Sequence, residues 1–251
     1  MNRRFSLIMT GLLATMLLLF STVSQAENQA EALLEQIDKK RTPASYESYF
    51  NIINQQPDGR EKKITAFAAK RSDGQAAVLI VSPPALRGRA ALRMGNEIWT
   101  HFPGETQLRK STLRHALVGG VFNNGDFLAT SFQADHDAVK VREVKGRYIL
   151  TLLPKQPLLP YQSIELTVNK RTLRPLSLVQ FASPGVIIKT IQFDYSRRSD
   201  DGKTTLTTLT TRAEANKLYR SEIRIGRINK RDFPDTTFTK ELLPRLGSIL
   251  K

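Results

Sequence analysis

Three histidines, His101, His115 and His136, are the side chains of this sequence best suited to acid–base or metal chemistry. No two of them have the spacing of metal ligands on one helix or strand, and there is no cysteine, so the sequence predicts no transition-metal site. Asp135 and Asp137 flank His136, and an acid beside a histidine can orient a general base. Adjacent residues point apart along a chain, however, and the members of a catalytic triad usually come from separate segments.

No motif of the sequence supplies a nucleophile or a nucleotide site. The Gly-x-Ser-x-Gly nucleophile elbow, the Walker motif and the glycine-rich dinucleotide motif do not occur. Ser131 lies near His136, but no pattern joins the two. A secreted hydrolase is an alternative that needs a nucleophile, a base and an acid to converge in space. We expect a protein without enzymatic activity, cofactor or metal.

The N-terminus has the layout of a secretory signal. Two arginines precede an apolar run, and a polar stretch with small residues ends at Ala26. We predict a signal peptide over residues 1–26 and one domain over residues 27–251. A retained membrane anchor is the alternative, although Thr10 and Gly11 interrupt the run and leave it short of the roughly 20 residues that a span needs.

The chain carries a formal net charge of +15 and no cysteine. Without disulfides, a secreted domain must be stabilised by burial and by sheet hydrogen bonds. A cationic surface is attracted to anionic lipid headgroups, nucleic acid or acidic proteins, and secretion argues against nucleic acid. Several basic residues stand mostly singly, as they also would on an ordinary solvated surface: Arg87, Arg89, Arg93, Arg109, Lys110 and Arg114.

The hydrophobic pattern predicts one helix followed by strands. Ala30, Leu33, Leu34 and Ile37 form an apolar stripe, which predicts a helix over residues 27–41 that covers a sheet. Beyond it, β-compatible runs alternate with turns rich in Gly, Asn and Asp. The predicted strands span residues 48–53, 62–70, 76–81, 89–94, 97–102, 140–144, 147–153, 163–168, 173–181, 186–195, 204–212 and 221–229. Short turns between them imply one antiparallel sheet, strongly curved toward a barrel.

Three segments depart from simple strand alternation. Residues 111–138 contain glycine and asparagine clusters, so we predict an irregular loop with helical turns that forms a lid. The tail, residues 238–251, has leucines near helical spacing and predicts a short closing helix. Residues 148–153 are apolar at consecutive positions, so that this strand is either covered on both faces or has one face on an apolar cavity.

An Arg-Gly strand start, a Trp-x-x-x-Pro strand and an Asn-x-x-Asp loop follow one another in the middle of the chain. Their residues are Pro84-Ala85-Leu86-Arg87-Gly88-Arg89-Ala90, Gly95-Asn96-Glu97-Ile98-Trp99-Thr100-His101-Phe102-Pro103, Leu108-Arg109-Lys110 and Phe122-Asn123-Asn124-Gly125-Asp126-Phe127. In type and order these motifs resemble those of the outer-membrane lipoprotein-sorting proteins, the LolA-like family. The later hairpins fit the family in layout.

The resemblance implies a mainly β fold, an unclosed antiparallel β-barrel (half-barrel) with an N-terminal helix, a helical or irregular lid insertion and a short C-terminal helix. It implies a periplasmic protein that carries lipoprotein acyl chains or other lipids in a hydrophobic cavity, without catalysis. The implied partners are the lipid cargo and, for some of the wider group, an RND-type transporter or an outer-membrane acceptor. We expect a monomer that binds no nucleic acid.

The expected cavity lining is aliphatic and aromatic, and the alternative for each residue is ordinary core packing: Ile98, Phe102, Leu150, Leu152, Ile164, Leu166, Val168, Leu176 and Leu178. The match to the family suggests that Arg87 closes the lid by hydrogen bonds to the region of Asn123 and Asp126, and the alternative is a surface arginine. We expect Trp99 to pack between sheet and helix. A second function class stays open, in which a filled barrel serves as an adaptor docked onto an envelope transporter.

Overall fold

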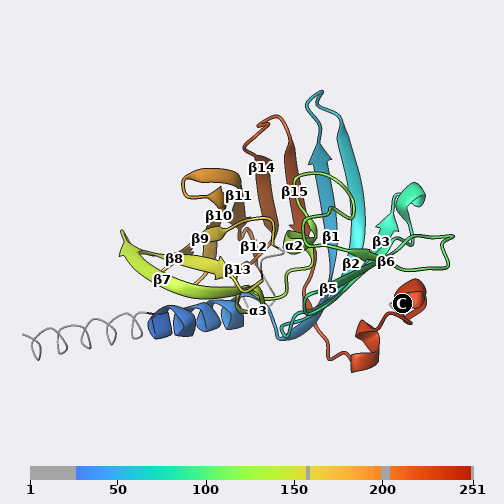
Figure 1. Ribbon diagram of the computed structural model, residues 1–251, viewed down its shortest axis with the longest axis horizontal. Helices are drawn as coiled ribbons and strands as arrows, with labels where there is room; N and C mark the ends of the chain where they lie inside the picture. The colour runs from blue at the N-terminus through green and yellow to red at the C-terminus, as the bar shows by residue number, and fades with distance from the viewer. Residues whose placement is uncertain (1–26, 157–158, 199–203, 250–251) are drawn as a thin grey trace, which may run out of the picture.

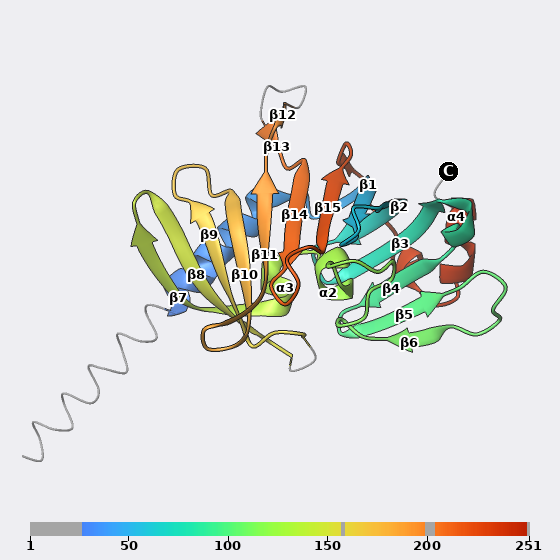
Figure 2. The ribbon, with the colours of Figure 1, turned by 90° about the horizontal axis from the view of Figure 1, so that it is seen from above.

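The computed structural model describes residues 27–156, 159–198 and 204–249. The predicted signal peptide, residues 1–26, lies outside them. A single antiparallel sheet dominates this part of the chain, with strand order β6-β5-β4-β3-β2-β1-β15-β14-β11-β10-β9-β8-β7 (Figures 1 and 2). The two end strands, β6 and β7, do not pair within the described residues. The predicted unclosed half-barrel is thereby confirmed.

The bounds of the elements agree with most of the predicted runs. The strands of the large sheet are β1 (Ser45–Gln55), β2 (Glu61–Arg71), β3 (Gln75–Ser82), β4 (Ala90–Met94), β5 (Glu97–His101), β6 (Arg109–Ser111), β7 (His136–Val144), β8 (Arg147–Pro154), β9 (Ser163–Asn169), β10 (Pro175–Ser183), β11 (Val186–Asp194), β14 (Thr208–Ala213), β15 (Arg220–Ile225) and β16 (Asn229–Lys230). A small separate pair joins β12 (Arg197–Arg198) to β13 (Thr204–Thr205). The short helices are α2 (Asn124–Phe127), α3 (Phe132–Asp135) and α4 (Leu246–Ile249), with 3-10 turns η1 (Pro84–Leu86), η2 (Asp235–Phe238) and η3 (Leu243–Arg245).

Alternation of side chains decides which face of each strand is buried. In β9 the side chains of Ile164, Leu166 and Val168 are buried, and the residues between them are partly exposed. Strand β8 behaves the same way, because Leu150 and Leu152 are fully buried while Leu153 is 40% exposed. Residues 148–153 are therefore not covered on both faces, and their inner side chains belong to the main apolar core.

The helix at residues 27–41 forms where it was predicted. It runs across the half of the sheet that ends in β7, as the blue helix of Figure 2 shows. Ala30, Leu34 and Ile37 have no exposed surface and join the main core. Glu31 accepts a hydrogen bond from the backbone N–H of Ala138, so the helix also ties down the free edge of β7. Of the helices that the structure describes, none is long and apolar enough to cross a membrane.

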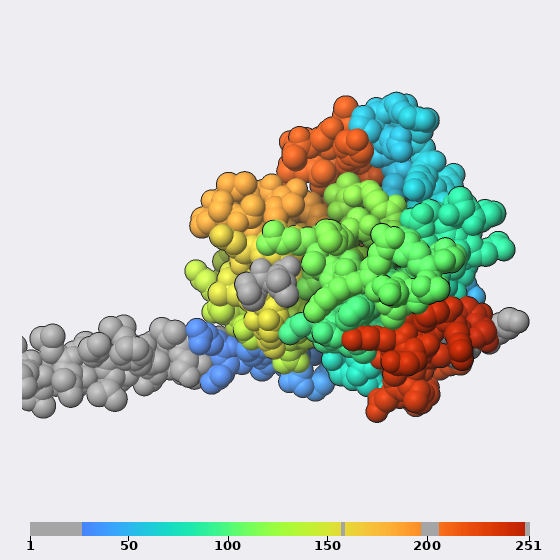
Figure 3. Space-filling model, turned by 45° about the vertical axis from the view of Figure 1, so that its right-hand side comes forward, coloured from blue at the N-terminus to red at the C-terminus, as the bar shows by residue number. Residues whose placement is uncertain are grey.

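A second apolar cluster lies on the other side of β2 to β5, where the C-terminal segment packs (red in Figure 3). Phe233, Phe238, Leu243 and Leu246 bury their side chains there against the outward residues of the sheet. Trp99 is partly buried in this cluster, and the Lys240 ammonium lies 3.9 Å from the centre of its ring. The short C-terminal helix is confirmed as α4.

Two expectations about single elements were wrong. Strand β7 begins at His136, inside the stretch predicted to be irregular, and the strand predicted over residues 204–212 is shifted to Thr208–Ala213. Because His136 and Asp137 are both polar, the start of β7 shows no alternation of apolar and polar residues in the sequence. The three-residue edge strand β6 was not predicted, because three charged or polar residues carry no apolar alternation.

Candidate binding cavity beneath the lid segment

Residues 112–135, here called the lid segment, fold over the concave face of the sheet. Figure 2 shows its helices α2 and α3 on the concave side of the sheet. They lie between its two halves, here called the wings, one from β6 to β1 and the other from β15 to β7. Asn123 caps α2 in a capping box with Asp126, and Ser131 caps α3 by accepting a hydrogen bond from the Ala134 N–H. Phe122, Phe127, Leu128 and Phe132 are buried in the main core. The lid segment therefore contributes apolar side chains to the interior of the half-barrel.

Buried cations from the sheet bind the backbone carbonyls of the lid segment. The Lys70 ammonium donates to the carbonyls of Phe127 and Ala129 at 2.8 and 2.9 Å. The Arg93 guanidinium donates to both carboxylate oxygens of Asp135 and to the Leu128 carbonyl at 3.5 Å. Arg93 is 1% exposed. A charge this deeply buried is tolerated only when it is paired and hydrogen-bonded, so these contacts fix the lid segment to β2 and β4.

Further contacts hold the lid segment from the opposite wing and from the helix. Lys189 of β11 forms a buried ion pair with Asp126 and donates to the Val121 carbonyl at 3.2 Å. Gln180 of β10 donates from Nε2 to Asp126 Oδ1 at 3.0 Å. Arg41, at the end of the helix, donates to the Thr130 carbonyl at 2.8 Å. The lid segment is thus bonded to both wings of the half-barrel.

The protonation of Lys70 makes the free energy of unfolding depend on pH. Burial, together with the neighbouring charges of Arg41 and Arg93, lowers the pKa of Lys70 to about 7 from its usual 10.5. Between these two values the unfolded chain holds a proton that the folded chain has released. The free energy of unfolding therefore rises with pH in this window, by at most about 1.4 kcal/mol per pH unit.

We expect the unfolding free energy of the wild type, minus that of Lys70→Met, to increase as the pH rises from 7 toward 10.5, because only the wild type has this titrating group. Urea unfolding at several pH values measures this difference. Lys62→Met, at an exposed lysine on the same strand, is the matched control and should leave the pH slope unchanged. Equal slopes for the wild type and Lys70→Met would contradict the assignment.

A cavity of about 70 Å³ remains between the lid segment and the concave face. Its apolar wall consists of Phe122, Ala129, Phe132, Ile164, Leu178, Ile191, Phe193 and Leu209. Its polar groups are Arg41, Asp126, Ser131, Asp135, His136, Tyr161 and Gln180. The walls come from the helix at residues 27–41, from the lid segment, from β9, β10, β11 and β14, from the start of β7 and from the connection before β9. Ligand pockets usually measure about 300–1000 Å³, so this cavity is small with the lid segment in place.

The histidine of this cavity is held in a hydrogen-bond chain. His136 Nδ1 lies 2.9 Å from the Phe132 carbonyl, and Nε2 lies 2.8 Å from the Tyr161 hydroxyl. Burial lowers the pKa of His136, against the raising effect of Asp135. In the neutral imidazole, Nδ1–H donates to the carbonyl and Nε2 accepts the proton of Tyr161. Both ring nitrogens are therefore engaged in structural bonds.

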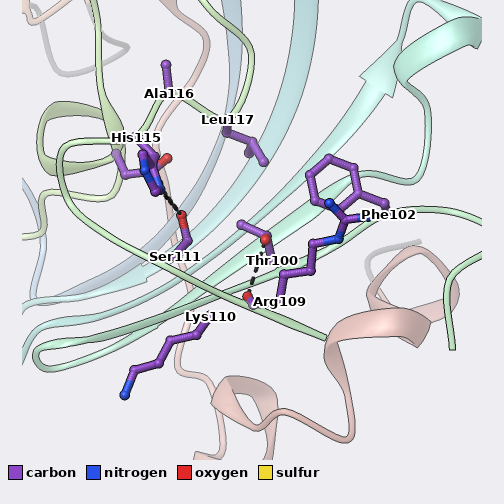
Figure 4. Close-up of a pocket in the computed structure, with 9 residues that line it drawn as sticks. Thr100, Phe102, Arg109, Lys110, Ser111, His115, Ala116 and Leu117 are labelled. Atoms are coloured by element: carbon purple, nitrogen blue, oxygen red, sulfur yellow. Dashed lines mark hydrogen bonds between the residues drawn. The ribbon is translucent and has the colours of Figure 1, made fainter. Parts of the chain in front are cut away.

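A second, more polar cleft of about 390 Å³ lies at the β5–β6 edge (Figure 4). Phe102 lines it, and the guanidinium carbons of Arg89 and Arg109 lie 5.3 and 5.1 Å from the centre of its ring. Figure 4 shows the Arg109 side chain beside this ring. Arg109 is itself paired with Glu105. Residues of the lid segment also line this cleft, but of the two the smaller cavity has the more apolar lining, which suits an acyl chain better.

The structure distributes the predicted lining residues over several places. Ile164 and Leu178 lie on the wall of the cavity. Ile98, Leu150, Leu152, Leu166 and Val168 are buried in the main apolar core and do not line the cavity. Leu176 is partly buried on β10, and Phe102 lies in the polar cleft. The roles of these residues toward a ligand stay predictions.

Of the three residues predicted to close the lid, two lie in the lid segment and one does not contact it as expected. Asn123 and Asp126 do lie in the lid segment, and Asp126 bonds it to β10 and β11. Arg87 is exposed, and its Nε donates to the Val81 carbonyl at 3.1 Å. The hydrogen bond expected from Arg87 to Asn123 is not formed among the described residues.

The cations that hold the lid segment were missed, and Arg93, counted among the singly placed basic residues of a cationic surface, is buried instead. A signal existed for Lys70, since it follows Ile64, Ala66 and Ala68 at two-residue intervals and so falls on the buried face of β2. Arg93 likewise follows Ala91 on β4. A single lysine or arginine at two-residue spacing from the buried residues of a strand indicates that its charge has a buried partner. The sequence does not identify that partner.

Within the described residues, no three His, Cys, Asp or Glu side chains gather as metal ligands. A LolA superfamily protein from Nitrosomonas europaea has the same fold, with a TM-score of 0.74 and 23% identity over 84% of this chain and 98% of that one. An outer membrane lipoprotein-sorting protein domain from Vibrio parahaemolyticus gives 0.72 and 13% over 87% and 100%. A DUF1329 family protein from Desulfovibrio piger gives 0.71 and 17% over 87% and 99%.

At these identities the likeness shows the fold, and the resemblance to the lipoprotein-sorting group is confirmed at that level. No curated protein sequence matches the chain. A family model described as "uncharacterized protein" matches residues 72–245. Because this match covers more than half of the chain, the chain belongs to that family of uncharacterized proteins, and its fold is that of LolA superfamily structures.

Proposed function

We propose that this chain is a periplasmic carrier of lipoprotein acyl chains or other lipids. In this proposal residues 1–26 are a cleaved signal peptide, and residues 27–251 are a half-barrel domain that acts as a monomer without catalysis. The acyl chain binds between the lid segment and the concave face of the sheet. The fold shared with a LolA superfamily protein and with a lipoprotein-sorting domain supports the proposal.

The observation that carries the proposal is the way the lid segment fills the concavity. Phe122 and Phe132 cover an aliphatic wall that includes Ile164, Leu178 and Ile191. An acyl chain that displaces the two aromatic side chains replaces one apolar contact by another. Each methylene buried contributes about 0.8 kcal/mol, so about ten of them supply the roughly 8 kcal/mol of a micromolar complex before the lid segment is moved.

The bonds of the polar side chains support a role in binding rather than in catalysis. Ser131 Oγ accepts from the Ala134 N–H and donates to the Ser72 carbonyl at 3.2 Å. Both nitrogens of His136 are engaged with Phe132 and Tyr161. The Ser131 hydroxyl therefore caps α3, and the His136 ring holds the lid segment through its bond to the Phe132 carbonyl.

The second candidate, an adaptor that docks onto an envelope transporter, is favoured by the small volume of the cavity. About 70 Å³ is too little for an acyl chain, so carriage requires the lid segment to move. An adaptor has no such requirement. The two candidates therefore differ in whether lipid accompanies the purified protein.

Native mass spectrometry of protein purified from the periplasm, followed by lipid extraction, separates them. We expect a lipid adduct on the wild type and its loss in Ile191→Asp, because a carboxylate in the apolar wall opposes acyl binding. Ile187→Asp is the matched control on the same strand, since Ile187 is 41% exposed. If Ile191→Asp does not fold, Ile191→Phe narrows the cavity without a charge. A lipid-free wild type, under conditions that keep lipid on an established carrier, favours the adaptor.

A further inference from the structure

Two residues that line the cavity, and a third bonded to one of them, carry unpaired polar side-chain atoms. Six buried side-chain atoms of the described residues lack a hydrogen-bond partner: Arg41 Nε, His101 Nδ1, Asn124 Oδ1, Thr130 Oγ1, Gln180 Oε1 and Tyr195 OH. Arg41 and Gln180 line the cavity, and Thr130 is bonded to Arg41 through its backbone. Buried polar groups are nearly always paired in folded proteins, so these unpaired ones need an explanation.

The two unpaired groups on the cavity wall are complementary. Gln180 is 2% exposed, and its Nε2 is already used by Asp126, which leaves Oε1 as an acceptor. The Arg41 guanidinium reaches Asp38 and the Thr130 carbonyl through its terminal nitrogen, which leaves Nε–H as a donor. The residues that line the cavity therefore hold one unpaired donor and one unpaired acceptor, which a ligand that displaces the lid segment can satisfy.

The charges around the cavity are balanced when Lys70, which donates to the carbonyl of the lining residue Ala129, is neutral, as it is above its pKa of about 7. Arg41 lies 3.5 Å from Asp38, while Asp126 pairs with Lys189 and Asp135 with Arg93. Three cations thus face three carboxylates. A phosphate brought into this space would add an uncompensated buried charge, which is strongly unfavourable. An uncharged group with both a donor and an acceptor fits.

We infer that Arg41 and Gln180 form a binding site for the uncharged amide linkage of an acylated ligand. The amide carbonyl accepts from Arg41 Nε–H, and the amide N–H donates to Gln180 Oε1. The acyl chain then extends along the wall of Ile164, Leu178 and Ile191. This inference rests on the proposed carrier function and narrows its cargo to amide-linked acyl chains.

A matched pair of ligands tests the inference on the full mature chain. N-methyl hexadecanamide and methyl hexadecanoate differ only in an N–H in place of an ester oxygen. The protein is loaded from an equimolar mixture of the two, separated from free ligand, extracted and quantified by mass spectrometry. We expect the wild type to retain the amide about tenfold over the ester, as a single buried hydrogen bond provides.

Gln180→Met removes the acceptor at similar side-chain size, and Arg41→Lys keeps the charge but removes Nε–H. Gln180→Met should retain ligand and bring the amide-to-ester ratio close to one. Arg41→Lys should lower the retention of both ligands and keep their ratio, because the carbonyl of either ligand accepts from Nε–H. Gln192→Met, at an exposed glutamine of the neighbouring strand, should keep the preference. The ratio is insensitive to a general loss of binding, so a partly destabilised variant still gives a result.

Equal retention of amide and ester by the wild type would overturn the inference while leaving the carrier proposal intact. Retention of neither ligand would overturn both. A preference that survives in Gln180→Met, or retention of both ligands by Arg41→Lys at the wild-type level, would place the recognition elsewhere and overturn the assignment. Hexadecyl phosphate is the third ligand, and its retention over the amide would show that the site takes an anionic headgroup instead.

Discussion

Arg93→Leu is expected to lower the free energy of unfolding by about 3–5 kcal/mol, because it leaves the Asp135 carboxylate buried without its partner. Arg93 is 1% exposed and Asp135 is 7% exposed, and the guanidinium donates to both carboxylate oxygens. The substitution also removes the donors to the Leu128 and Gly95 carbonyls. Urea unfolding followed by circular dichroism measures the loss.

The double variant Arg93→Met with Asp135→Leu should recover much of that loss, since a buried ion pair is replaceable by apolar side chains of similar size. Arg87→Leu is the matched control at an exposed arginine close by in the sequence, and it should shift the stability by less than about 0.5 kcal/mol. A loss below about 1 kcal/mol for Arg93→Leu would mean that the pair does not anchor the lid segment.

Lys189→Met should open the lid segment without unfolding the sheet. Lys189 is 3% exposed and is the cationic partner of Asp126, so its removal leaves a buried carboxylate with neutral donors only. A loss of about 3 kcal/mol in the closed form raises the open population roughly a hundredfold. Hydrogen exchange of the amides in residues 112–135 measures this population directly.

Lys170→Met provides the comparison for a solvent-exposed pair. Its ammonium lies 2.7 Å from Glu143, but both side chains are about half exposed, and such pairs contribute about 0–1 kcal/mol. We expect exchange in the lid segment to be unchanged in this variant. Exchange that accelerates over the whole sheet in Lys189→Met would show global destabilisation and contradict a local role.

The sequence predicted the elements whose signals are local. The apolar stripe of the helix at residues 27–41 and the alternation of Ile164, Leu166 and Val168 each depend on spacing alone, and both elements formed where expected. The wrong start of β7 lies at a point where polar residues interrupt that signal. Boundaries of this kind depend on tertiary contacts, here the hydrogen bond from Ala138 to Glu31.

The candidate site was less predictable, because its polar contacts join residues far apart in the sequence. Asp126 was singled out from a motif, yet its partners Gln180 and Lys189 lie on strands of the opposite wing. The phase of Lys70 in β2 marks it as buried, but only the fold shows that its ligands are carbonyls of the lid segment. Two of the nine predicted lining residues, Ile164 and Leu178, reach the cavity.

Strand β15 has a consequence for how the chain acquires this structure. It lies between β1 and β14, with Ile225 paired to Phe50, so the centre of the sheet joins segments from near the two ends of the chain. Such non-local pairing requires a long loop to close before any contact stabilises it, and it slows folding.

During synthesis or passage through a pore, β1 and β2 emerge long before β15. Until β15 arrives, the inner edge of β1 presents unpaired backbone groups, which is the situation that favours wrong strand pairing and aggregation. The pairing of β1 with β15 therefore forms late, and the sheet is complete only after the C-terminal strands have emerged. A chain truncated before Arg220 lacks the strand that pairs with both β1 and β14.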